Sequence, residues 1–198
     1  MSWIPLAELP LWRDNQYMAT LPIYEDPGPE FVSVREYLTS SYRPDCDYVD
    51  GRIEERNVGE YDHSYLQTLL VYLFMNHQEE WGVRPLPEVR VQVKATRFRV
   101  PDLTVIRAGT PRERILTHPP LLVIEILSPE DRLSRMTERT DEYLDFGIEN
   151  IWIVDPARRL AYRVTRAGFE LAPTGEITVP GTPIRLVLSD LFAELDRG

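Results

Sequence analysis

The stretch LLVIEILSPEDRLSRMTERTDEYLDFGIENIWIVDP, residues 121–156, decides the fold class of this chain. Its first seven residues are an apolar, β-rich run, typical of a strand covered on both faces, and its last six residues predict another buried strand. Between the two strands, Ser128 and Pro129 can start a helix with acids in its first turn, and Gly147 can end it. Strands joined by a helix predict an α/β protein.

The sequence before this stretch predicts a tight hairpin and a long helix. Asp50-Gly51 lies between two short alternating segments, a strong hairpin signal that places Glu54 on the second strand. Apolar residues then recur three and four positions apart over 60–81, which is the stripe of a core-facing helix that Gly82 ends.

Residues 83–106 alternate with period two on either side of Ala95-Thr96. We therefore expect a second β-hairpin that runs into a longer strand carrying Asp102. After the central stretch, the tail predicts meandering β-structure and a closing helix near 188–195.

These elements predict one domain over residues 31–198. Its expected fold class is α/β, a mixed β-sheet flanked by helices, with extra β-hairpins. An irregular, proline-rich arm is expected over residues 1–30.

The composition excludes several classes of protein. The single cysteine, Cys46, rules out an internal disulfide and a thiolate zinc cage. No apolar run approaches the roughly 20 residues needed to cross a bilayer. The net charge of −10 excludes a general positive coat for nucleic acid but not a local basic patch. We expect a reducing, cytoplasmic setting and no membrane partner.

Two acidic residues interrupt strands that should be buried. Glu125 lies within LLVIEIL and Asp102 in a second apolar segment, where a carboxylate is costly unless it is paired, hydrogen-bonded or bound to a metal. Carboxylate oxygens suit Mg²⁺ or Mn²⁺, and Mg²⁺ commonly keeps several waters beside one or two carboxylates. Together with Glu54, these acids favour a metal site at which all three side chains converge.

A structural role would explain either strand acid taken alone. Asp102 could cap a turn, and Glu125 could pair with Arg97 or Arg99. His63, early in the long helix, could approach the acids, but a single helical histidine more often packs or forms a hydrogen bond.

A set of short motifs stands in a defined order over roughly residues 31–190. They are 48–54 (YVDGRIE), His63, 100–102 (VPD), 123–129 (VIEILSP), Tyr143, Gly147 and 151–156 (IWIVDP). Together they resemble the Uma-two family of bacterial predicted endonucleases, which has the restriction-endonuclease-like fold of the PD-(D/E)xK superfamily.

The resemblance implies roles for individual residues. Asp102 corresponds to the aspartate of the PD motif and Glu125 to the second acid, and both would be metal ligands. Glu54 corresponds to a further acidic position that would complete or support the site. The superfamily has a lysine two residues after the second acid, where this chain has Leu127. In the Uma-two branch a lysine on the following helix substitutes for it, at the position that is Arg139 here.

Arginine at this position changes the expected chemistry. Arg139 keeps its proton, so it can hold a phosphate or stabilise negative charge but is a poor general base. Arg132, Arg135 and Arg139 share one stripe of the predicted helix. That stripe could contact a DNA backbone, or it could be a solvated face paired with Glu138 or Asp141.

The residues and the resemblance together predict a Mg²⁺- or Mn²⁺-dependent endonuclease acting on DNA. Asp102 and Glu125 would hold the metal, with Glu54 in support, and Arg139 would stabilise the transition state. A catalytically inactive nuclease-fold module that binds nucleic acid or protein is the alternative, favoured by the missing lysine and the negative charge. The resemblance to a family whose members commonly pair also implies a homodimer.

Overall fold

The computed structural model of the chain describes residues 31–56, 60–129, 131–172 and 175–197. The arm expected over 1–30 lies outside the described residues. Residues 31–198 form one compact unit by their contacts.

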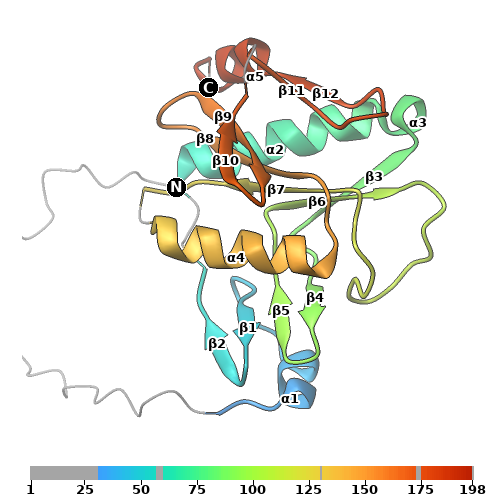
Figure 1. Cartoon of the computed structure of the whole chain (residues 1–198), viewed down its shortest axis with the longest axis vertical. Coiled ribbons are helices and arrows are strands. Elements are labelled where there is room, and N and C mark those ends of the chain that lie inside the picture. The colour runs from blue at the N-terminus through green and yellow to red at the C-terminus, as the bar shows by residue number, and fades with distance from the viewer. Residues whose placement is uncertain (1–30, 57–59, 130, 173–174, 198) are drawn as a thin grey trace, which may run out of the picture. The chain divides into compact units, whose positions relative to one another are not determined.

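A six-stranded sheet forms the centre of this unit (Figure 1). Its strands are β3 (Val83–Pro87), β6 (Leu103–Arg107), β7 (Leu122–Ile126), β8 (Ile151–Asp155), β9 (Leu160–Thr165) and β10 (Gly168–Leu171). They lie in the order β10-β9-β8-β7-β6-β3, with β7 and β8 parallel and the other neighbours antiparallel. Every residue of β7 and β8 is buried, which confirms the two strands predicted from the central stretch.

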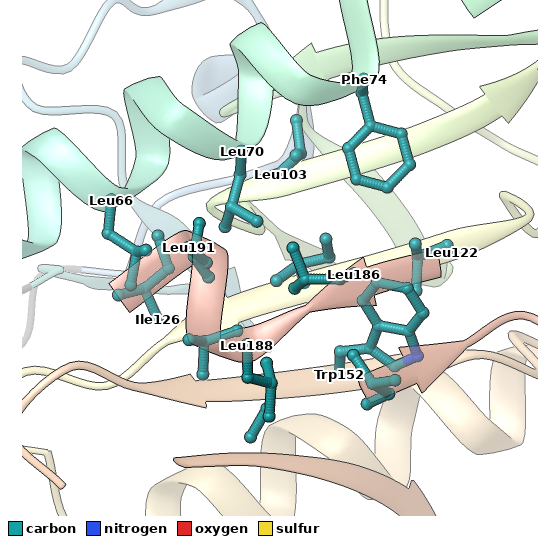
Figure 2. Packing of buried hydrophobic residues seen from close by; sticks show 14 of the residues in the cluster. Leu66, Leu70, Phe74, Leu103, Leu122, Ile126, Trp152, Leu186, Leu188 and Leu191 are labelled. Carbon is teal, nitrogen blue, oxygen red and sulfur yellow. The ribbon is translucent and has the colours of Figure 1, made fainter. Parts of the chain in front are cut away.

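Helices cover both faces of the central sheet. They are α2 (Tyr61–Asn76), α4 (Leu133–Phe146) and α5 (Leu188–Leu195). The short helix α3 (Gln78–Trp81) follows α2, and α1 (Val34–Thr39) packs in a separate cluster through Tyr37. Leu66, Leu70 and Phe74 of α2 pack with α5 against one face, in the cluster around Trp152 that Figure 2 shows. Met136 and Tyr143 of α4 pack against the other face. The expected mixed sheet flanked by helices is therefore confirmed.

A second, four-stranded sheet is built from the two hairpins. Its strands are β1 (Asp47–Val49), β2 (Arg52–Glu54), β4 (Val91–Lys94) and β5 (Arg97–Arg99), in the order β2-β1-β5-β4. Asp50 and Gly51 both have positive φ, 47° and 94°, as a tight primed turn requires. The hairpin predicted at this dipeptide is confirmed. A separate pair of short strands, β11 (Glu176–Thr178) and β12 (Arg185–Val187), precedes α5.

Gly51 has a positive-φ backbone and lies against the exposed ring of Phe31. The ring of Phe31 occupies the place where a Cβ atom of residue 51 would lie, whereas Gly109, with φ of 88°, has nothing within 4 Å of that place. We expect Gly109→Ala to cost about 1–2 kcal/mol for its left-handed backbone alone. Gly51→Ala should cost more, because it must also displace the ring. Urea unfolding of both variants measures the difference, and equal losses would contradict a role for Phe31.

Two predicted elements are interrupted in the structure. The helix expected over 60–81 breaks at His77, whose ring nitrogen lies 2.9 Å from the carbonyl oxygen of Leu73, and α3 then ends at Gly82. The prediction of a longer strand that carries Asp102 is also wrong. Because Pro101 has no N–H for the ladder, the chain leaves the small sheet after β5 and enters the central sheet at β6, and Asp102 lies between the two.

The predicted start of α4 is wrong as well. The backbone N–H of Ser128 donates to Asp131 Oδ2 at 2.7 Å, and the Asp131 N–H donates back to the Ser128 carbonyl, so these residues form a turn before the helix. The helix begins at Leu133, after Arg132, which makes no side-chain cap. Its predicted end is confirmed, since Gly147 closes it with φ of 99°.

Within the described ranges, none of the helices combines the length and the apolar character that crossing a membrane requires.

Candidate active site

Glu125 lies on β7, and Asp102 directly precedes the neighbouring strand β6. Leu103 pairs with Ile124 in the β6–β7 ladder, so the residue before Leu103 lies across from the residue after Ile124. Alternation along the strands places both acids on the face that α4 covers. The Ile126 N–H donates to Asp102 Oδ2 at 2.8 Å, which ties the loop acid to β7. Both side chains are buried.

Asp102 is held by two basic groups. The guanidinium of Arg56 donates to Oδ1, and Nε2 of His63 lies 3.3 Å from Oδ2. Burial alone would raise the pKa of Asp102, but the hydrogen bond from His63 and the charge of Arg56 outweigh it and lower the pKa. Burial likewise opposes protonation of His63, but Asp102 outweighs it and raises the pKa of the imidazole. Asp102 is therefore an ionised group at neutral pH.

Glu125 has a different environment. Tyr143 donates to Oε1 at 2.6 Å, and Arg139 Nη1 donates to Oε2 at 3.4 Å. Burial raises the pKa of Glu125 to about 7; the charge of Arg139 opposes the rise and that of Asp102 adds to it. Two buried carboxylates close together repel, so this pair favours an additional positive charge.

Sequence reasoning missed Asp47, which also binds Arg139. Asp47 is fully buried on β1, and its Oδ2 accepts from Arg139 Nη2 at 3.0 Å. A usable signal existed, because the two-residue turn at Asp50-Gly51 fixes the register and sets Asp47 opposite Glu54. Counting the ladder back from the turn would have placed a second acid beside the predicted one.

Glu54 joins this group through arginine. Its Oε2 lies 3.1 Å from Arg99 and 3.7 Å from Arg135, and these are its ion pairs within the described residues. Arg97 and Arg99 both pair with Glu142, and neither is the partner of Glu125 that the structural alternative proposed. The structure brings Asp102 and Glu125 together across the β6–β7 ladder. Glu54 is connected to Glu125 only indirectly, through Arg99, Asp47 and Arg139.

A small pocket of about 50 Å³ opens at these groups. Its lining includes Arg56, His63, Asp102 and Arg139, with Arg132 and Arg135 exposed at its rim. A larger depression of about 570 Å³ adjoins it and shares lining residues with it, among them His63, Ser128, Arg132 and Met136. The stripe of three predicted arginines therefore lines the same pocket as Asp102, and Arg135 pairs with Glu54 rather than with Glu138 or Asp141.

The family model Uma2, described as "Putative restriction endonuclease", matches residues 34–186 of this chain. The chain belongs to the Uma2 family. No curated protein matches this Uma2 protein. A crystal structure described as "a putative nuclease belonging to DUF820 from Anabaena variabilis" is similar over 83% of the chain and 99% of its own, with 24% identity and a TM-score of 0.71. That likeness shows the fold.

A cryo-EM structure described as a DrdV–DNA complex is similar over 68% of this Uma2 protein and 11% of its own chain, with 18% identity and a TM-score of 0.39.

The donor set of the Uma2 site fits a hard divalent cation. Across the described ranges, no three His, Cys, Asp or Glu side chains gather as a metal-binding group, so any ion here rests on two carboxylates, with water and substrate as further ligands. Asp102 Oδ1 and both oxygens of Glu125 each accept one hydrogen bond from their described partners, which leaves each a lone pair. Asp102 and Glu125 are the residues that would hold Mg²⁺ or Mn²⁺.

Proposed function

We propose that this Uma2 protein is a Mg²⁺- or Mn²⁺-dependent endonuclease that hydrolyses phosphodiester bonds of DNA. The observation that carries the proposal is the pair of buried acids on β7 and before β6, with Arg139 reaching over it from α4. Membership of a family described as restriction endonucleases supports nuclease activity independently of this geometry.

Each group at the site has a task in this proposal. An ion held by Asp102 and Glu125 would polarise the scissile phosphate and lower the pKa of the attacking water. Arg139 offers planar N–H donors to the phosphate oxygens and stabilises their growing negative charge. His63 donates to Asp102, which orients that carboxylate and keeps it ionised.

Positive charge at the pocket rim supports a nucleic-acid substrate. Arg132 and Arg135 are exposed beside the acids, where they can bind the phosphates that flank the cleaved bond. The net charge of −10 gives no general attraction to DNA, so these contacts must act locally. We therefore expect binding that weakens as salt rises.

Cleavage by the unaltered protein should require a divalent cation. We expect nicking of supercoiled plasmid with Mg²⁺ or Mn²⁺ and none in EDTA, because neither Arg139 nor His63 supplies the missing water activation. A homodimer, which we also propose, would place two sites on two strands and give linear product directly. Agarose gels resolve the three plasmid forms. If DNA and RNA substrates remain uncut with either metal present, the proposal is wrong.

Arg139→Lys tests whether arginine replaces the lysine of the family pattern. We expect this variant to cleave at least as fast as the parent, because its ammonium restores the group that the resemblance implies there. Arg139→Gln, which removes the charge, should be slower by about 10²-fold or more. A lysine variant as slow as the glutamine variant would show that the two-pronged guanidinium itself is needed.

One observation favours an inactive binding module as the second candidate. Arg56 and Arg139 already supply positive charge to the two strand acids, which is a stable arrangement without any ion. A protein of this kind would retard labelled DNA in EDTA in a gel-shift assay and leave it uncut when metal is added.

A further inference from the structure

Two carboxylates, from two different sheets, form ion pairs with Arg139. Its Nη2 donates to Asp47 Oδ2 at 3.0 Å and its Nη1 donates to Glu125 Oε2 at 3.4 Å. The contact with Asp47, on the small sheet, is the shorter. A guanidinium has a rigid fork of donors, so fixing one prong fixes the direction of the other.

Asp47 makes two further hydrogen bonds besides the one with Arg139. Its Oδ1 accepts from the Val100 N–H at 2.8 Å, and its Oδ2 also accepts from Arg99 Nη1 at 3.0 Å. Glu142 holds Arg99 from the other side, at 2.7 Å from Nε. The bond from the Val100 backbone holds Asp47 independently of its arginine partners, so Asp47 can anchor Arg139.

We propose that Asp47 is a positioning residue that fixes the guanidinium of Arg139 over the Asp102–Glu125 pair. Without it, Arg139 would keep only the longer contact with Glu125, which orders its long, flexible side chain less firmly. Asp47 also takes part of the charge of Arg139, which leaves Glu125 able to bind a further cation. The catalytic benefit rests on the proposed function, whereas the anchoring does not.

Glu142 supplies a matched control. It is buried as deeply as Asp47 and on the same helix as Arg139, but its described partners are Arg97 and Arg99. Glu142→Gln therefore damages the same buried ionic cluster without touching Arg139. If Asp47 were merely structural, Asp47→Asn and Glu142→Gln would have the same effects.

The anchoring can be measured without any activity. In ¹⁵N-labelled protein, the Nη protons of Arg139, assigned by their loss in Arg139→Lys, should give separate signals because the guanidinium cannot rotate freely. Asp47→Asn should merge or broaden them, and Glu142→Gln should leave them separate. Averaged signals in the unaltered protein would overturn the proposal even if Asp47→Asn failed to fold. Unchanged signals in Asp47→Asn, or equal loss in Glu142→Gln, would overturn it too.

The kinetic consequence uses plasmid nicking with Mn²⁺. Asp47→Asn should lower kcat by about 10–100-fold, as loss of an orienting partner does, with little change in KM. On an Arg139→Gln background the same change should cost nothing further, because Asp47 acts through Arg139. Additive losses would overturn the proposal. If the unaltered protein cleaves nothing, the endonuclease proposal fails, and the Nη signals still decide whether Asp47 anchors Arg139.

Discussion

Asp102→Asn should abolish divalent-dependent nicking and destabilise the protein at the same time. Cleavage should fall by well over the roughly 10–100-fold typical of residues that only orient a ligand, because Asp102 would touch the ion itself. The side chains of Arg56 and His63 are only 9% and 13% exposed, and the change leaves both without their carboxylate. Breaking a buried pair from one side costs about 3–5 kcal/mol, and we expect the lower end because Arg56 keeps Glu88.

Glu88→Gln is the matched control for this variant. It removes the other carboxylate of Arg56, but that group is half exposed, so the loss should be about 0–1 kcal/mol, with nicking retained. Urea unfolding and plasmid assays on both variants give the comparison. If Asp102→Asn is as stable as the parent, the ion pairs of the pocket contribute little to the free energy of unfolding.

Glu125→Gln should also abolish nicking, but with the opposite effect on stability. The pKa of Glu125 is raised by burial to about 7, so the folded state holds its proton more tightly than the unfolded state does. Such a group contributes its full stability below the unfolded pKa near 4.5 and loses it as the pH rises through 7. At pH 8 the ionised carboxylate therefore costs roughly 3 kcal/mol. Glutamine removes that cost.

We expect Glu125→Gln in EDTA to be more stable than the parent at pH 8 and no more stable at pH 4.5. Glu142→Gln should be less stable than the parent at pH 8, and this loss of stability should become smaller toward low pH. Burial opposes ionisation of Glu142, but Arg99 and Arg97 outweigh it and lower the pKa, so its contribution is present at neutral pH and lost as the pH falls. Unfolding curves at both pH values check the two signs. A stability gain for Glu125→Gln that grew toward low pH would contradict the assignment of the raised pKa.

Local patterns were enough to predict most of the fold. Asp50-Gly51 predicted its hairpin because positive φ at two adjacent residues is a property of the dipeptide itself. The closing helix at 188–195 and the strands around Glu125 also follow from short apolar patterns. The failures occur where a local pattern competes with contacts it cannot include. Ser128 has the composition of a helix cap, but Asp131 takes its N–H into a turn.

The site was predictable only in part. Asp102 and Glu125 stand out because charge within an apolar run is unusual at the level of sequence. The hairpin register could have placed Asp47 beside Glu54, but the contacts of Asp47 and Arg56 with groups on distant segments could not be predicted, because they depend on tertiary packing. Whether a given arginine meets Glu125 or Glu142 depends on the packing of α4, which no local spacing encodes.

The ion pair between Asp47 and Arg139 also affects the stage of protein synthesis at which the site can form. The two residues are 92 positions apart in the chain. Contacts between such distant segments form late, because a long loop must close before they bring any gain. A growing chain still attached to the ribosome can carry both strand acids and the small sheet while α4 has yet to emerge. Under the proposed function, such a nascent chain lacks its arginine and should cut DNA at least about 10²-fold more slowly than the finished protein.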